Sequence, residues 1–227
     1  MLRVEFSFRT FEIGISKLFG IWSLEFGYWS LPMRIISGAS KGRKLRMLSG
    51  RSVRPTSDRV KESIFNILGD EVKDKVVLDL FAGTGNLGIE ALSRGAAKVV
   101  FVEKSRQALR IIERNLLETE MAVRSEVLPK DVTRAIGILA QKSESFDLLL
   151  MDPPYREGWI MKTLERIRRT PIHHEGSLLV IEHDRREPLP DVVEGWEVIK
   201  QRKLGDTLVS FLVPKKSRYP ASFGGED

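Results

Sequence analysis

From Val76 to Glu182 the sequence alternates between short apolar runs and longer amphipathic stretches. The apolar runs predict strands at 76–81, 98–102, 123–127, 146–151 and 177–182. The amphipathic stretches predict helices at 87–94, 106–117, 132–140 and 159–168. Two further runs, at 196–200 and 207–213, predict a β-pair. Strands separated by helices form βαβ units, so we predict an α/β fold with a mostly parallel sheet and helices on both faces.

A different pattern precedes this alternation. Residues 33–46 predict two short strands joined by a turn of glycine, serine and lysine. After a proline, Thr56 or Ser57 can cap a helix that runs through Leu68, and Gly69 fits its end. We therefore expect a small β-hairpin and helix ahead of the sheet.

The net charge of +6 is concentrated in this extension. Residues 33–62 carry nine lysines and arginines against two acids, a net of +7, so the rest of the chain sums to −1. A basic segment this dense favours a polyanionic partner, and nucleic acid fits best. The residues predicted to contact RNA are Arg34, Lys41, Arg43, Lys44, Arg54, Thr56 and Arg59. Helix capping is the alternative for Thr56.

Cysteine is absent, and the three histidines lack metal-ligand spacing. We therefore expect no disulfide, no metal site and a cytoplasmic protein. No stretch reaches the roughly 18 apolar residues that a membrane span needs, so we expect no membrane association.

Residues 1–32 differ from the rest and hold eight of the chain's eighteen aromatic residues. They could form a weakly structured arm, or they could be an upstream extension of a protein that starts at Met33. The second interpretation is favoured, because a coherent pattern begins abruptly there. The expected domains are a non-native or disordered 1–32, a basic RNA-binding 33–70, a catalytic 71–213 and a disordered tail 214–227.

The strand expected at 146–151 is followed by Asp152, Pro153, Pro154 and Tyr155. Proline fixes φ and lacks an N–H, so carbonyl groups here are left as outward-facing acceptors. The carboxylate and a carbonyl can accept both N–H bonds of an exocyclic amino group, while the aromatic ring stacks on the base. A Pro-rich turn without a function is the alternative. We predict that these four residues form the catalytic corner.

A glycine-rich loop follows the first predicted strand. Gly83, Gly85 and Gly88 let the backbone turn tightly and approach a ligand at the carboxyl end of the sheet. The spacing also fits a dinucleotide site, with Glu103 twenty residues after Gly83. A nicotinamide oxidoreductase is therefore an alternative from spacing alone.

Asp79, four residues before Gly83, favours a different ligand. Its carboxylate would repel a pyrophosphate but could meet an ammonium group. Glu103 could accept both hydroxyls of a ribose, and Asp131 could accept from an adenine amino group or cap a helix. With the amine-accepting corner, these groups describe S-adenosyl-L-methionine. The predicted cofactor-binding residues are Asp79, Phe81, Ala82, Gly83, Thr84, Gly85, Glu103 and Asp131.

Together these motifs resemble a known family. From Met33 to about Val213 the chain resembles the Rossmann-like class I S-adenosylmethionine-dependent methyltransferases, specifically the RsmD type that methylates N2 of a guanine in bacterial 16S ribosomal RNA. The motifs that carry the resemblance, in chain order, are RIISG at 34–38, GRKL at 42–45, RPTSDRVKE at 54–62, DLFAGTG at 79–85, DPPY at 152–155 and GDT at 205–207.

This resemblance implies a seven-stranded sheet whose last strand is antiparallel, and a monomer. It implies methyl transfer to guanine 966 in the usual bacterial numbering, on the small ribosomal subunit or an assembly intermediate. Adenine-N6 methylation of DNA or RNA is the nearest alternative, since DPPY serves that chemistry too. A non-catalytic RNA-binding assembly factor is the other.

Overall fold

The computed structural model describes residues 33–48, 58–170, 172–190, 193 and 195–215. The chain divides into two units between Leu31 and Pro32, and all described residues belong to the second unit. The predictions for residues 1–32, for Arg54 and Thr56, and for 216–227 of the tail lie outside the described residues.

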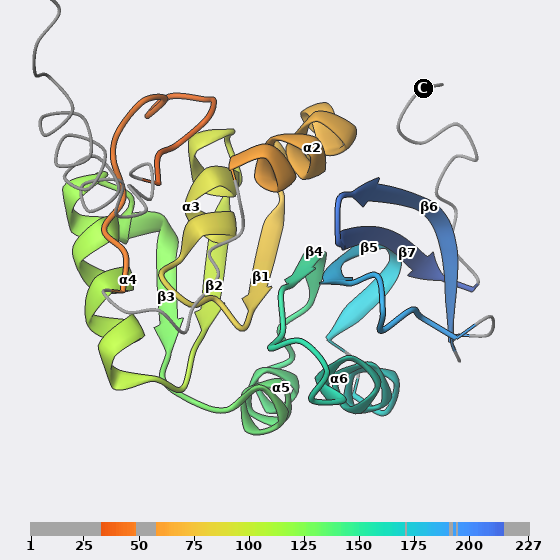
Figure 1. The fold of residues 1–227 in the computed structure, drawn as a ribbon. Coiled ribbons are helices and arrows are strands. Elements are labelled where there is room, and N and C mark those ends of the chain that lie inside the picture. The colour runs from red at the N-terminus through yellow and green to blue at the C-terminus, as the bar shows by residue number, and fades with distance from the viewer. Residues whose placement is uncertain (1–32, 49–57, 171, 191–192, 194, 216–227) are drawn as a thin grey trace, which may run out of the picture. The chain divides into compact units, whose positions relative to one another are not determined.

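A seven-stranded sheet in the order β3-β2-β1-β4-β5-β7-β6 forms the centre of the fold (Figure 1). The strands are β1 Val76–Leu80, β2 Lys98–Val102, β3 Ser125–Leu128, β4 Phe146–Met151, β5 His173–Asp184, β6 Trp196–Leu204 and β7 Thr207–Pro214. Strands β1 to β5 pair in parallel. Strand β7 runs antiparallel to both β5 and β6. This confirms the mostly parallel sheet with an antiparallel last strand.

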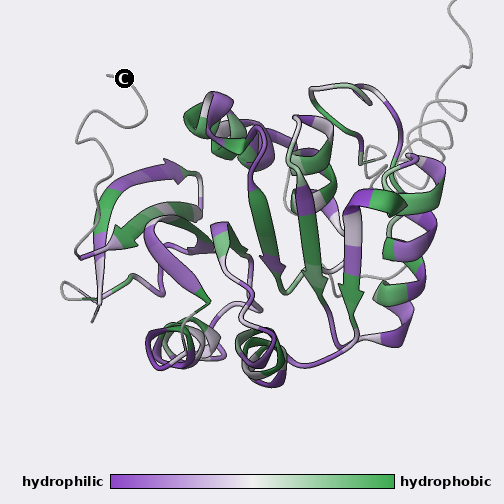
Figure 2. Cartoon of the chain, turned by 180° about the vertical axis from the view of Figure 1, so that it is seen from behind, coloured by the Kyte–Doolittle hydropathy of each residue, from purple (hydrophilic) through white to green (hydrophobic). Residues whose placement is uncertain are grey.

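Helices cover both faces of the sheet. They are α2 Asp58–Leu68, α3 Asn86–Ser93, α4 Arg106–Glu118, α5 Val132–Gln141 and α6 Trp159–Arg168, with short 3₁₀ turns at Gly69–Val72 and Ala122–Arg124. Apolar residues of α2, α3 and α4 pack in one cluster and those of α5 and α6 in another. Each cluster takes alternate residues of the central strands, because successive side chains of a strand point to opposite faces. Figure 2 shows these strands mainly hydrophobic, whereas the helices carry both characters.

The predicted N-terminal hairpin is shorter than expected. Only an isolated bridge joins Arg34 to Lys44, around a turn in which Gly38 and Gly42 have positive φ. The reason lies in the backbone donors, since the N–H groups of Ile36 and Ser37 bind the Glu90 carboxylate of α3. The hairpin is thus built against α3 instead of forming a regular ladder.

Several other boundaries differ from the predictions; strand β6, for example, continues to Leu204. Residues 122–124 form a 3₁₀ turn, so β3 starts only at Ser125. Strand β5 starts at His173, where Ser177 helps by donating a hydrogen bond to the carbonyl of Phe146 in β4. Pro214 closes β7 and belongs to the sheet. Within the described ranges, the helices are all too short or too polar to cross a membrane.

Candidate active site

A cavity of about 570 Å³ opens where β1, β2, β3 and β4 end. This volume lies within the range of small-molecule sites, and the carboxyl edge of a parallel sheet is where such ligands bind. Its lining residues are Met33, Met47, Leu48, Phe81, Ala82, Gly83, Thr84, Asn86, Val102, Glu103, Lys104, Ser105, Ala108, Lys130, Asp131, Val132, Asp152, Pro153, Pro154, Tyr155, Glu157 and Trp159. The cavity thus gathers the catalytic corner and most of the predicted cofactor residues.

The loop after β1 forms the floor of this cavity. Phe81 and Gly83 both have positive φ, as does Gly85, the residue that precedes α3. A side chain on Gly83 would meet little beyond one carbonyl oxygen at 4.0 Å, whereas one on Gly85 would come within 3.1 Å of Ile89. Gly83 therefore leaves open space at the cavity, while Gly85 allows α3 to pack closely behind it.

Asp79 lies behind this loop and does not line the cavity. It is only 2% exposed, and its carboxylate accepts a hydrogen bond from the N–H of Gly88 at 2.9 Å. The pKa of Asp79 is raised to about 8, mainly by burial; the N–H of Gly88 opposes the shift, and the negative charges of Asp152 and Glu103 add to it. The structure gives Asp79 a bond to α3, and its predicted contact with an ammonium group stays a prediction.

Glu103 lies at the cavity and ties three backbone groups together. It accepts hydrogen bonds from the N–H groups of Gly83 at 2.9 Å, Lys104 at 2.8 Å and Ser105 at 2.7 Å. A carboxylate has about four lone-pair sites, so one acceptor position remains for a ligand hydroxyl. The residue therefore connects the β1 loop to the β2 loop at the point where the ribose is predicted.

Asp131 has the capping geometry that the sequence left open. Its carboxylate accepts hydrogen bonds from the hydroxyl of Thr133 at 2.6 Å and the N–H of Arg134 at 3.1 Å, at the start of α5. The Thr133 hydrogen bond is the main reason that the pKa of Asp131 is lowered. The capping interpretation is confirmed, and because Asp131 also lines the cavity, adenine binding stays a compatible prediction.

All four residues of the catalytic corner line the cavity beside the β1 loop. The phenol of Tyr155 donates a hydrogen bond to Glu182 at 3.1 Å. Its pKa is raised well above the usual value, mainly by burial and then by the charges of Glu182 and Asp152. Carboxylates at Glu103 and Asp152 give the cavity a negative field, which favours a cationic ligand over a pyrophosphate.

Several lining residues were not predicted from the sequence. Trp159 packs edge-on against Phe81 with the ring centres 5.8 Å apart, and the ammonium groups of Lys104 and Lys162 lie 5.4 and 4.5 Å from its ring centre. Trp159 follows a glycine at the start of α6, and no motif marks it. Hydrophobic lining also comes from the hairpin, through Met33, Met47 and Leu48.

Some cations of the basic segment are exposed without a described ion pair, and others contact acidic side chains or backbone carbonyls. The side chains of Lys41, Lys44 and Arg59 are exposed, as predicted for phosphate contacts. Arg43 donates to the carbonyl of Glu118 at the end of α4 and forms an ion pair with Glu120 in the turn after it. These contacts compete with a phosphate for its guanidinium. Arg34 is exposed and lies 3.7 Å from Asp58.

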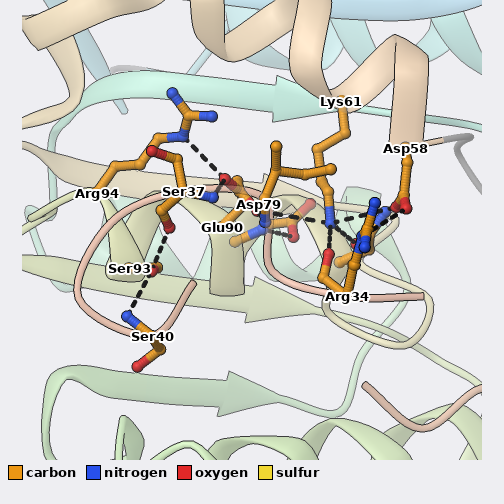
Figure 3. A network of polar contacts seen from close by, with 12 residues as sticks. Arg34, Ser37, Ser40, Asp58, Lys61, Asp79, Glu90, Ser93 and Arg94 are labelled. Atoms are coloured by element: carbon orange, nitrogen blue, oxygen red, sulfur yellow. Dashed lines mark hydrogen bonds and ion pairs between the residues drawn. The ribbon is translucent and has the colours of Figure 1, made fainter. Parts of the chain in front are cut away.

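Lys61 does not contribute to the basic surface, although it was counted there. Its side chain is fully buried, and its ammonium group donates to the carbonyl of Arg34 and, at 2.7 Å, to the side chain of Asn86. It also lies 3.5 Å from the buried Glu90, which binds Arg94 at 2.9 Å (Figure 3). Its charge therefore has to be subtracted from the basic surface expected of residues 33–62, because the hairpin, α2 and α3 enclose it.

Comparison with known proteins agrees with this geometry. Residues 33–213 match the family model described as Conserved hypothetical protein 95. YlbH of Bacillus subtilis is 39% identical over 78% of this chain and 97% of that protein. Ribosomal RNA small subunit methyltransferase D of Escherichia coli is 34% identical over 76% of this chain and 85% of that protein. The solved structure of the Escherichia coli protein yhhF superimposes with a TM-score of 0.71 at 32% identity, over 81% of this chain and 98% of that one.

Proposed function

Because the chain belongs to the Conserved hypothetical protein 95 family, which includes ribosomal RNA small subunit methyltransferase D, we propose that it methylates a guanine N2 amine in 16S ribosomal RNA. The chain has the class I methyltransferase fold that the sequence predicted. The observation that carries the proposal is one cavity shared by the β1 glycine loop and the corner at Asp152. A donor pocket and an amine-accepting corner in one cavity suit group transfer between two bound molecules.

The residues of the cavity fit S-adenosyl-L-methionine. Glu103 would hold the ribose, Asp131 the adenine amino group, and the negative field would favour the sulfonium and the ammonium group. Phe81, Ala82, Gly83 and Thr84 would lie along the ligand, while Trp159 offers an aromatic wall. When bound, this cofactor supplies a methyl group on a positively charged sulfur, which is already a strong electrophile.

The enzyme's task is then to prepare the nucleophile. A guanine amino nitrogen shares its lone pair with the ring, so it attacks poorly. The carboxylate of Asp152 and the carbonyl of Pro153 would accept its two N–H bonds and draw the nitrogen toward tetrahedral geometry. The target base would be flipped out of the RNA and would stack on the ring of Tyr155. Asp152 would accept the proton that the amine releases or pass it to water. Alignment and electrostatics carry this mechanism.

The RNA would approach over the hairpin. Lys41, Lys44 and Arg59 offer exposed charges for phosphates, and the inner residues of the same hairpin line the cavity. The phosphate backbone would therefore be bound beside the cavity in which the corner at Asp152 receives the target base. The partner we propose is the small ribosomal subunit or its assembly intermediate, bound by a monomer in the cytoplasm.

Nucleoside analysis tests the proposed reaction. The full chain is incubated with methyl-labelled S-adenosylmethionine and small subunits from bacteria that lack the modification, and the RNA is digested to nucleosides. We expect the label in N2-methylguanosine. Label in N6-methyladenosine would replace the proposal with the adenine alternative, and intact cofactor binding without any transfer would favour a non-catalytic assembly factor.

A further inference from the structure

The corner at Asp152 is fastened to the neighbouring ends of β5 and β7. Besides its hydrogen bond to Glu182 of β5, the hydroxyl of Tyr155 interacts with the side chain of Thr207, the first residue of β7, which lowers the Tyr155 pKa against the larger effect of burial. Glu182 and Thr207 are only 4% and 2% exposed. Strands β4, β5 and β7 are neighbours in the sheet (Figure 1). The two partners of Tyr155 therefore come from strands next to the one that precedes it.

The next residue is held from the same side. Arg156 has a φ of 59°, a conformation that costs free energy outside glycine. Its backbone N–H donates to the carboxylate of Glu187 at 2.6 Å, and its guanidinium donates to Asp184 at 2.8 Å. Such a backbone persists only when surrounding contacts fix it. The segment after β4 is therefore held in one conformation by residues of the β5 end.

The two hydroxyl partners of Tyr155 are chemically complementary. A phenol has one proton to donate, and Glu182 takes it. The side chain of Thr207 interacts with the same hydroxyl and lowers the Tyr155 pKa, as a donor to the phenol oxygen does. The hydrogen bond to Glu182 fixes the position of the phenol oxygen, and the ring at the cavity wall cannot swing without breaking it.

We propose that Glu182 and Thr207 are positioning residues that hold the ring of Tyr155 in place for the target base. This inference rests on the proposed function, because it assigns the ring a base to receive. It also gives a role to the Gly205-Asp206-Thr207 motif. Gly205 has a φ of 66° in the turn from β6 to β7, and this turn delivers Thr207 at the start of β7.

Kinetics can separate this role from a purely structural one. Glu182→Ala and Thr207→Val each remove one partner of the phenol. We expect kcat to fall about tenfold or more, because a small misplacement of a reacting group is costly, while the affinity for S-adenosylhomocysteine changes less than about twofold. Glu182→Gln keeps an acceptor at the same position and should recover most of the lost kcat.

The matched control is Arg185→Ala. It removes an exposed ion pair with Asp206 at 2.8 Å in the same corner, without touching the phenol. Its kcat should stay close to that of the wild type. If Glu182→Ala and Thr207→Val lower only the melting temperature and leave kcat at the control's value, the inference is wrong. The ratio of kcat between variant and wild type is measured for whichever nucleoside carries the methyl group. A wrong guanine assignment would therefore change the product but not this ratio.

A second measurement needs no turnover. The chain has three tyrosines, and fluorine NMR of protein labelled with 3-fluorotyrosine can follow Tyr155 after assignment with Tyr155→Phe. We expect its resonance to lie away from the unfolded position in the wild type. It should move toward that position and sharpen in Glu182→Ala and Thr207→Val, since the ring becomes free to rotate. An unchanged resonance in both variants would overturn the inference.

Discussion

Lys61 of α2 places its ammonium nitrogen 2.7 Å from the side-chain oxygen of Asn86, which lines the cavity at the start of α3. The same nitrogen binds the carbonyl of Arg34 in the hairpin. One buried cation therefore joins α2, the hairpin and the cavity wall (Figure 3). The hairpin owes its fixed position to this contact and to Glu90, which accepts from its backbone.

Replacing Lys61 tests this contact. Lys61→Met keeps the length of the side chain but leaves the buried Glu90 with Arg94 as its remaining charged partner in the network of Figure 3. Breaking a buried pair on one side typically costs about 3–5 kcal/mol, and we expect a loss of unfolding free energy in that range by urea denaturation. Exposed Lys44→Met, the control, should stay within about 0.5 kcal/mol of the wild type.

The double variant Lys61→Met/Glu90→Gln sharpens the test. It removes both charges, so its loss of stability should be smaller than the sum of the two single losses by at least about 1 kcal/mol. Simple additivity would mean that the two buried groups do not act as a pair.

Gly88 and Gly137 form a matched pair of helical glycines. A Cβ on Gly88 would lie 2.3 Å from the ring of Phe101, whereas one on Gly137 would meet only the movable end of Arg166 at 2.7 Å. We expect Gly88→Ala to destabilise by about 1–3 kcal/mol. Gly137→Ala should be neutral or stabilise by up to about 1 kcal/mol, as alanine does inside helices. Equal effects in thermal unfolding would contradict the close packing of α3 on β2.

Asp79 predicts a pH dependence of stability. Burial raises its pKa to about 8 from an ordinary 3.8. Between these values the folded protein keeps a proton that the unfolded chain has lost. The unfolding free energy should therefore fall as pH rises through this window, by at most about 1.4 kcal/mol per pH unit from this group. Asp79→Asn lacks the contribution, so it should gain stability relative to the wild type between about pH 5 and pH 7 in urea curves. Parallel pH profiles would contradict the assigned shift.

Lys41 and Lys44 test the RNA surface. Replacing both with alanine should weaken binding of small ribosomal subunits and reduce the slope of log affinity against log salt by about one for each lost phosphate contact. The control is Lys73→Ala/Lys203→Ala, which removes the same charge from exposed positions that do not line the cavity. Cofactor affinity should stay unchanged in both. An equal loss with the control would show that only net charge matters.

Local patterns explain why much of the fold could be predicted. The strand periodicity gave β2 and β4 at their observed bounds, and the glycine loop and the DPPY corner lie at strand ends, where an α/β sheet binds ligands. These features depend on nearby residues only. Pairing with β4 extends β5 upstream to His173, and that extension depends on a neighbouring strand.

The features that were missed depend on distant partners. Lys61 looks like a surface base within its own helix, and only the hairpin and α3 bury it. The hydrogen bond from the N–H of Gly88 to Asp79 was not predicted either, because it forms only when α3 packs against β1. Trp159 reaches the cavity only because α6 starts next to Phe81. Such contacts are set by tertiary packing, which residue spacing does not encode.

Asp152→Ala provides the most direct test of the proposed chemistry. The variant lacks the carboxylate that would accept from the target amine, while Glu103 keeps its own hydrogen bond to the N–H of Gly83. Two quantities are measured on the full chain: methyl transfer to small ribosomal subunits, and the affinity for S-adenosylhomocysteine by calorimetry. We predict that transfer falls by at least about a hundredfold while affinity changes little. Substantial turnover by the variant would contradict the role of the corner at Asp152 as the amine acceptor.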